Sequence, residues 1–105
     1  MPEIVDTPIT VGSSSIDLGS AIREHAEQEI LKVADKYFRR LNTASVHFTG
    51  EGDDFRCSVN IRMGGLDMMS AEAEAKDAYL AFNSALTKVE KQLRRTKREL
   101  RDDKH

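Results

Sequence analysis

The chain has 105 residues, of which 32% are charged and 39% hydrophobic, and this composition suits one small domain spanning residues 1–105. A net charge of −2 and a pI near 5.9 exclude indiscriminate nucleic-acid binding, so any contact with a polyanion must be local. No apolar run approaches the roughly 18 residues of a membrane helix, and the start, MPEIVDTPIT, lacks the basic and apolar regions of a signal peptide. The single cysteine cannot form an internal disulfide. These features predict a cytoplasmic protein without a membrane partner.

The first part of the chain is expected to form an edge strand and then a helix. Residues 4–11 are rich in β-branched types, and the proline among them removes one hydrogen-bond donor, which is typical of an edge strand. Gly12 and the serines after it predict a turn, and Gly19 or Ser20 can begin a helix. The apolar positions of that helix recur at steps of three and four residues as far as Leu41, and they are Ile22, Ala26, Ile30, Val33 and Tyr37.

Three more strands are expected in the middle of the chain. Apolar and polar side chains alternate over residues 44–49 and, most clearly, over residues 55–63. The sequence GEGDD at 50–54 predicts the turn between them, and the glycines at 64–65 predict the next turn. Residues 66–73 predict a weaker fourth strand. Because short turns join these three strands, we expect them to be antiparallel neighbours.

Residues 75–104 predict one long helix with an apolar edge and basic faces. At 100° per residue, the apolar positions fall within about 40° of Phe82, and they are Leu86, Val89, Leu93 and Leu100. The cations form one row opposite this edge (Lys88, Lys91, Arg95 and Arg98) and a second row beside it (Arg94, Lys97, Arg101 and Lys104). Residues 88–105 therefore carry a net charge of +4, whereas residues 1–87 carry −6.

This charge segregation indicates a polyanionic ligand. Like charges at i, i+4 spacing cost a helix a few tenths of a kcal/mol per pair, so helix stability does not explain them. Lysine and arginine neutralise phosphates and release counterions, and arginine binds phosphate oxygens bidentately. A charge run of this kind is often only a solvated helix face, and the like-charge spacing makes that interpretation weaker here.

The element order is strand, helix, three strands, helix. One apolar stripe on each helix and one apolar sheet face predict an α+β fold, a two-layer sandwich with a four-stranded, mostly antiparallel sheet and both helices packed on one face. Such packing sets the helices side by side. The basic residues of the first helix, Lys32, Lys36 and Arg39, would then border one continuous basic groove with those of the second.

No residue pattern supports an enzyme, a metal site or a cofactor. None of the three histidines has a second metal ligand at a workable spacing. Cys57 lies in the inward register of its strand, which predicts a buried, inert thiol. Asp53 and Asp54 are turn residues, and the short glycine-containing turns lack the lysine and hydroxyl of a phosphate-binding loop. We therefore expect no catalytic residue, no metal ligand, no cofactor and no small-molecule substrate.

The C-terminal sequence AEAKDAYLAFNSAL, followed by TKVEKQLRRTKRELRDDKH, resembles the end of the bacterial ribosome hibernation promoting factors. This family also contains the ribosome-associated inhibitor, the ribosomal subunit interface proteins and the proteins once labelled sigma-54 modulation proteins. AIREHAEQEI at 21–30 and SVH at 45–47 match as well, so the resemblance covers nearly the whole chain. Family members have the strand and helix order that the periodicities predict.

The resemblance implies that the domain lodges in the small ribosomal subunit, where mRNA and the A-site and P-site tRNAs would lie, and blocks translation in stationary or stressed cells. The expected partners are the small subunit, its rRNA and other hibernation factors. Basic residues of both helices would touch the rRNA. The expected RNA-binding residues are Arg23, Lys32, Lys36, Lys88, Lys91, Arg94, Arg95, Lys97, Arg98 and Arg101.

Two other classes of protein stay open at this point. One is a protein-interaction module whose basic C-terminal helix binds an acidic partner. The other is a double-stranded RNA binding domain, but its last helix begins with basic residues, whereas AEAEAKD at the equivalent place is acidic. The family also has short members and long members with an added dimerisation domain, and the chain fits either the short form or the N-terminal domain of the long form.

Overall fold

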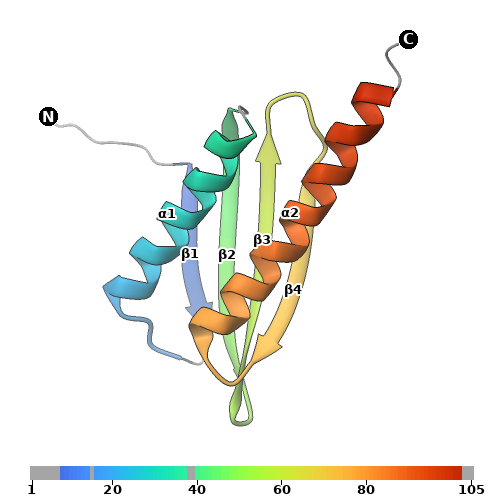
Figure 1. The fold of residues 1–105 in the computed structure, drawn as a ribbon. Helices are drawn as coiled ribbons and strands as arrows, with labels where there is room; N and C mark the ends of the chain where they lie inside the picture. The colour runs from blue at the N-terminus through green and yellow to red at the C-terminus, as the bar shows by residue number, and fades with distance from the viewer. Residues whose placement is uncertain (1–7, 15, 38–39, 103–105) are drawn as a thin grey trace, which may run out of the picture.

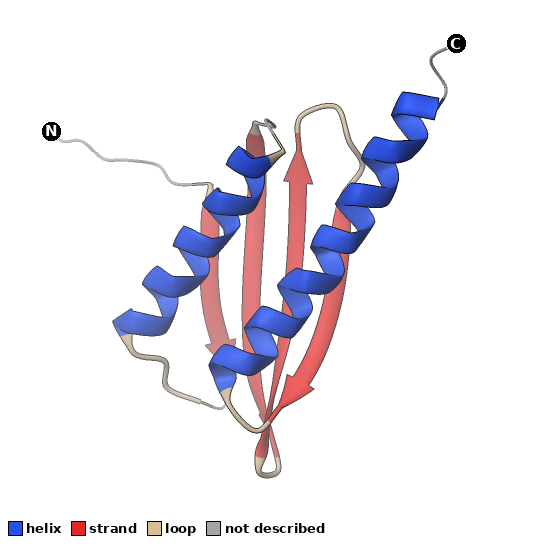
Figure 2. Cartoon of the chain, in the orientation of Figure 1, coloured by secondary structure: helices blue, strands red, loops and turns tan. Residues whose placement is uncertain are grey.

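The computed structural model describes residues 8–14, 16–37 and 40–102, with side chains described as far as residue 96. Its elements are β1 (Ile9–Ser14), α1 (Ser20–Lys36), β2 (Leu41–Glu51), β3 (Asp54–Met63), β4 (Met69–Ala75) and α2 (Ala78–Asp102). The strands form one sheet in the order β1-β2-β3-β4, in which β1 is parallel to β2 and the other neighbours are antiparallel. Both helices cover the same face of the sheet (Figure 1, Figure 2). The predicted α+β sandwich is confirmed.

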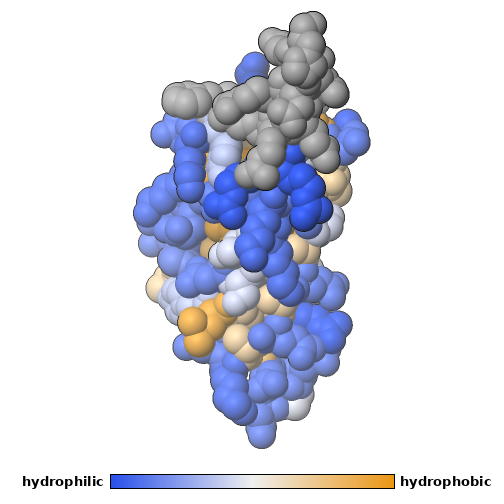
Figure 3. Space-filling view, turned by 45° about the vertical axis from the view of Figure 1, so that its right-hand side comes forward, coloured by the Kyte–Doolittle hydropathy of each residue, from blue (hydrophilic) through white to orange (hydrophobic). Residues whose placement is uncertain are grey.

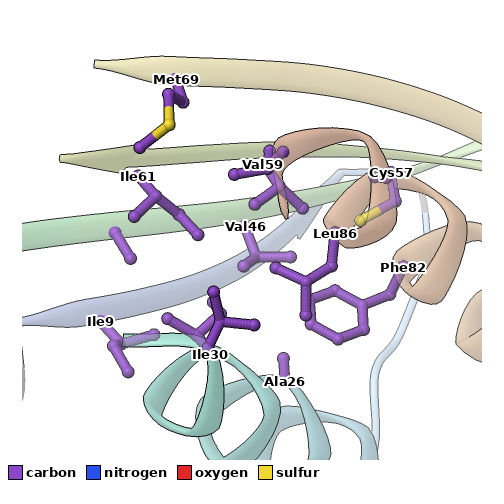
Figure 4. Packing of buried hydrophobic residues seen from close by; sticks show 14 of the residues in the cluster. Ile9, Ala26, Ile30, Val46, Cys57, Val59, Ile61, Met69, Phe82 and Leu86 are labelled. Carbon is purple, nitrogen blue, oxygen red and sulfur yellow. The ribbon is translucent and has the colours of Figure 1, made fainter. Parts of the chain in front are cut away.

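The core lies between the helices and the sheet. Alternate residues of β2 and β3 face inward, and Val46 pairs with Val59 across the ladder, both buried. The predicted apolar stripe of α1 is buried, as are Phe82, Leu86, Val89 and Leu93 of α2. Figure 4 shows Phe82 and Leu86 pointing toward the sheet residues Val46 and Val59. This packing fixes the rotation of α2 and leaves Lys91, Arg94 and Arg95 exposed on the outside of the helix.

A core substitution on α2 tests this helix rotation. Leu86 is 6% exposed and belongs to the main hydrophobic cluster. Leu86→Ala should lower the free energy of unfolding by about 2–4 kcal/mol, because it removes buried apolar surface and leaves a cavity. Urea denaturation of both proteins measures the difference. The matched control is Leu80→Ala on the same helix, where the side chain is 57% exposed, and its effect should stay within about 0.5 kcal/mol.

The predicted turn at Gly12 and the serines after it is wrong in position. Strand β1 continues through Gly12 to Ser14, and Gly12 pairs with His47 of β2. Glycine and serine favour turns locally, but the parallel ladder with β2 supplies backbone partners that outweigh this preference. The Ser13 hydroxyl donates to the carbonyl of Ile16 at 3.0 Å where the chain leaves the strand. The predicted residues before Pro8 lie outside the described residues.

The predicted extension of the first helix to Leu41 is also wrong. Helix α1 ends at Lys36, and Tyr37 has left the helical conformation with its amide bonded to the carbonyl of Val33 at 3.3 Å. Leu41 instead begins β2 and pairs with Met63, with a register shift before Thr43. Leu41 fits the helix pattern because it is apolar and follows Tyr37 by four positions. Its pairing with β3 outweighs this local preference and places it in a strand.

Local chemistry explains the other boundaries. The Asp77 side chain accepts hydrogen bonds from the amides of Tyr79 (2.7 Å) and Leu80 (3.4 Å), which caps the start of α2. Gly52 has a φ of 62°, the left-handed conformation that a tight hairpin between β2 and β3 requires. The turn lies at residues 52–53, inside the predicted 50–54, because the flanking residues belong to β2 and β3. The predicted turn at 64–65 is confirmed, and the predicted helix at 75–104 begins three residues later than expected.

The sheet face without helices is polar. Ser58 lies between His47 and Glu72 in one cross-strand row, and its hydroxyl donates to the Glu72 carboxylate at 3.2 Å. In the neighbouring row, the Ser70 hydroxyl donates to Asn60 Oδ1 at 2.6 Å. One wet and one buried face is the usual arrangement of a small antiparallel sheet. This face carries both charge signs, in contrast to the outer face of α2.

Candidate nucleic-acid interface

All of the predicted RNA-binding residues lie on α1 or α2. Three are on α1 (Arg23, Lys32 and Lys36), and the others are on α2. The two helices touch, because His25 of α1 hydrogen-bonds Asn83 of α2 at 3.1 Å and packs edge-on against Tyr79 and Phe82. Figure 3 shows that the surface on the α2 side of the molecule is mostly hydrophilic. The two helices are therefore in contact, but the predicted cations on them have different surroundings.

Four of the predicted residues are engaged within the protein, and three of them have a single partner each. Arg23 donates to the carbonyl of Val11 in β1 at 2.6 Å, and Lys88 donates to the carbonyl of Glu72 in β4 at 2.8 Å. Lys32 pairs with Glu29 one turn earlier on α1 at 3.1 Å, in a solvent-exposed position. Arg23 and Lys88 thus tie each helix to an edge strand of the sheet. A phosphate ligand would have to compete with these contacts.

Lys36 is engaged more fully, at the junction of the two helices. Its amine contacts Oε2 of Glu90 at 2.7 Å, and the Tyr37 hydroxyl donates to the same oxygen at 3.1 Å. The Glu90 side chain is only 19% exposed. The hydrogen bond between Lys36 and Glu90 lowers the pKa of Glu90 and raises the pKa of Lys36. The pKa of Tyr37 is raised mainly by burial and, to a smaller extent, by its hydrogen bond to Glu90. An anion therefore sits between the helices, and the predicted continuous basic groove is interrupted there.

The lowered pKa of Glu90 makes part of the stability pH-dependent. A carboxylate whose pKa is depressed by folding stabilises the protein above its unfolded pKa, about 4.3, and this contribution is lost as pH falls through the folded pKa. Glu90→Gln should therefore lower the free energy of unfolding by about 1 kcal/mol or less at pH 7. Below pH ~4 the difference from the wild type should shrink toward zero. Thermal denaturation of both proteins between about pH 3 and about pH 7 measures this difference. A stability difference between wild type and variant that grows in acid would contradict the prediction.

Three cations remain uncommitted on the outer face of α2. Lys91, Arg94 and Arg95 are exposed and make no hydrogen bond or ion pair with any residue whose side chain is described. Arg94 lies near enough to Glu90 and Lys36 to influence their pKa values, so it stands beside the helix junction. These three residues can bind phosphate oxygens without breaking an internal contact.

Two hollows flank these cations. One has a volume of about 300 Å³ and is lined by Asn83, Ser84, Thr87, Lys88 and Lys91. The other, of about 370 Å³, lies between the β3–β4 connection and α2, and is lined by Leu66, Asp67, Met68, Met69, Gln92, Arg95 and Thr96. Hydroxyl, amide and cationic groups in the first hollow suit a phosphate backbone. The second hollow also contains apolar side chains.

The remaining predicted residues are Lys97, Arg98 and Arg101. Their backbone lies in α2, but their side chains lie outside the described part of the structure, as do Arg39 of the predicted groove and Lys104 of the second basic row. Sequence reasoning missed the Glu90 junction and both hollows. One signal was present for Glu90, because it follows the buried Val89 and lies beside the apolar edge of α2, where it can face α1.

Groups that could support other chemistry are absent or inert in the described residues. No cluster of three histidine, cysteine, aspartate or glutamate residues that could hold a metal ion occurs there. Cys57 is buried, as the sequence predicts, and burial raises its pKa to about 12, so the thiolate that would act as a nucleophile is disfavoured. Within the same residues, no helix has the length and apolar character needed to cross a membrane.

The described residues form a small α+β domain with exposed cations on the outer face of α2, and comparison with known sequences shows its family. The family described as "Sigma 54 modulation protein / S30EA ribosomal protein" matches residues 9–101. The chain belongs to this family.

Individual relatives give the same picture. The chain is 27% identical over 94 residues to the "Ribosome hibernation promotion factor" of Bradyrhizobium diazoefficiens. This match covers 90% of the chain and 46% of the relative. It is 26% identical over 94 residues to the protein of the same name from Rhizobium meliloti, covering 90% of this chain and 50% of that protein. The chain thus spans about half the length of the curated relatives that it matches.

Two solved structures share the fold. The N-terminal domain of Thermus thermophilus Protein Y superposes with a TM-score of 0.74 at 22% identity, covering 83% of this chain and 94% of that domain. A ribosomal subunit interface protein from Coxiella burnetii gives the same TM-score and identity, with 85% and 96% covered. The fold inferred from periodicity is therefore one that occurs among ribosomal subunit interface proteins.

Proposed function

We propose that this domain is a ribosome hibernation module that binds the small ribosomal subunit and blocks translation. The contact runs along the outer face of α2, where Lys91, Arg94 and Arg95 bind rRNA phosphates, and the domain occupies the channel that mRNA and tRNA would use. In this role the domain regulates translation in stationary or stressed cells. Access to ribosomes requires that the protein is in the cytoplasm. Binding and occlusion, without catalysis, are sufficient for it.

The observation that carries this proposal is the group of three exposed cations without an internal partner. A cation that is already paired gains little by moving to a phosphate, because it loses one contact as it forms another. Lys91, Arg94 and Arg95 have no such contact to lose among the described side chains. They project from one face of a helix whose opposite edge is held in the core. The core therefore holds the backbone of α2 in place, while the three side chains stay free to turn toward phosphate oxygens.

The other predicted residues differ in how readily they can bind rRNA phosphates. Lys88 adjoins Lys91 in the first hollow and can turn to a phosphate if it releases the carbonyl of Glu72. Lys36 is neutralised by Glu90, and Arg23 is held by β1, so both serve first to fix the helices. Lys97, Arg98 and Arg101 extend the basic sequence toward the end of α2. The interface that we propose is therefore centred on the second helix.

The charge distribution favours one orientation on the ribosome. The chain has a net charge of −2, although residues 88–105 carry +4. A polyanionic surface attracts the end of α2 and repels the acidic remainder, which includes Glu51, Glu72 and Glu74 around Arg56 on the helix-free sheet face. Such a molecule binds rRNA through one face only.

Salt dependence of binding to purified small subunits tests the proposal. Three phosphate contacts predict that log K falls against log salt with a slope of roughly −2 to −3, and further contacts from the end of α2 would make it steeper. Purified large subunits serve as the control and should bind more weakly at every salt concentration. Affinity for small subunits that stays flat between low and physiological salt would contradict the electrostatic contact.

A further inference from the structure

We propose that the hollow between the β3–β4 connection and α2 is a nucleobase pocket, which receives one unstacked RNA base while Arg95 binds the adjoining phosphate. This inference rests on the proposed RNA contact and adds a non-electrostatic component to it. The pocket is lined by Leu66, Asp67, Met68, Gln92, Arg95 and Thr96, together with the buried Met69. Its volume of about 370 Å³ lies in the range of ligand-binding pockets.

The pocket combines an apolar surface with a cation. Met68 is 54% exposed, and Leu66 beside it is partly buried against the core, so both offer apolar surface to the hollow. A thioether makes favourable contacts with an aromatic ring, often at the ring edge. Arg95, which lines the same hollow, makes no ion pair with Asp67 or any other described residue. An apolar ring attached to a phosphate satisfies both features, and a nucleotide is a ligand of that kind.

Polar groups in the pocket suit the edge of a base. The Gln92 amide nitrogen donates to the carbonyl of Ser70 at 2.9 Å, which fixes the side chain against β4. Its amide oxygen accepts no hydrogen bond from the described residues, and the Thr96 hydroxyl makes none with them. Asp67 adds a carboxylate acceptor. Donors and acceptors held around an apolar surface are what a splayed-out base requires for recognition.

The position of the pocket favours a nucleotide within an RNA strand over a free nucleotide. Arg95 follows Lys91 by one helical turn, and Lys91 lines the other hollow on α2. A strand bound along this face can place successive phosphates on these cations while one base turns inward toward Met68. A free nucleotide has only one base and one phosphate position to offer.

The test compares a short oligoadenylate strand with an abasic strand of the same length, both titrated with the protein. Wild-type protein should bind oligoadenylate roughly fivefold to tenfold more tightly than the abasic strand. Met68→Ser should remove this preference with an unchanged salt slope. Arg95→Gln should weaken binding of both strands and reduce the salt slope by roughly one unit. The matched control is Leu31→Ser, a comparably exposed apolar residue (48%) on α1, which should retain the preference.

The outcomes separate this inference from the proposed function. Equal binding of the two strands by the wild-type protein, or a preference that survives Met68→Ser, would overturn the pocket while leaving salt-dependent binding to small subunits intact. Adenosine monophosphate that binds as tightly as the strand would also overturn it, because the site would then take a free nucleotide. Loss of small-subunit binding at all salt concentrations concerns the proposed function instead.

Discussion

Replacing Lys91, Arg94 and Arg95 together by glutamate should lower the affinity for small ribosomal subunits by on the order of 100-fold or more, because three phosphate contacts at about 1 kcal/mol each are lost and repulsion is added. The salt slope should fall by roughly three units. The free energy of unfolding should change by less than about 1 kcal/mol, because all three side chains are exposed and bind no described residue. Binding titrations and urea denaturation of the same preparations measure both quantities.

A matched variant separates a specific contact from a general effect of charge. Arg40, Arg62 and Lys76 are also exposed cations, and they lie outside the helices. Their replacement by glutamate changes the net charge by the same amount, but it should reduce affinity only a few-fold, through long-range repulsion that salt screens. Equal losses in the two triple variants would contradict an interface on the outer face of α2. So would unchanged binding in the α2 variant.

The fold could be predicted from the sequence because its pattern is consistent over long segments. The alternation of apolar residues in β3 and the apolar stripe of α2 each specify one buried face, and the structure buries those faces. At two of the misplaced boundaries, local preference and strand pairing disagree. Gly12 favours a turn, but it lies in a parallel ladder with His47. Leu41 fits the helix pattern, but its partner is Met63, which is distant in the sequence.

The candidate site was predictable in outline only. The sequence indicates which cations lie on the outside of α2, because their angular positions oppose Phe82 and Leu86. It does not indicate which cations are already engaged. Lys36 of α1 is held by Glu90 of α2, and Lys88 of α2 is held by the carbonyl of Glu72 in β4. Each partner lies on another element, so only the folded structure shows that these two lysines are engaged. The pocket at Met68 likewise arises from segments brought together by the fold.

The second large effect concerns translation. If the domain fills the channel for mRNA and tRNA, adding it to a cell-free reaction should inhibit initiation on free small subunits nearly completely once binding is saturated. Subunits already loaded with mRNA and initiator tRNA should be protected. The triple glutamate variant of Lys91, Arg94 and Arg95 should not inhibit at the same concentration. Initiation is measured by formation of the first peptide bond, and equal inhibition of free and loaded subunits would indicate a site elsewhere.

Equilibrium competition tests the central claim most directly. Labelled domain is bound to purified small subunits at physiological salt, and mRNA with initiator tRNA is added in increasing amounts. Two ligands that weaken each other through one site must do so by the same factor, so displacement of the domain by tRNA and of tRNA by the domain should give the same coupling. We expect complete displacement of the domain at saturating mRNA and initiator tRNA. Undiminished binding of the domain under those conditions would contradict the proposed occupation of the decoding channel.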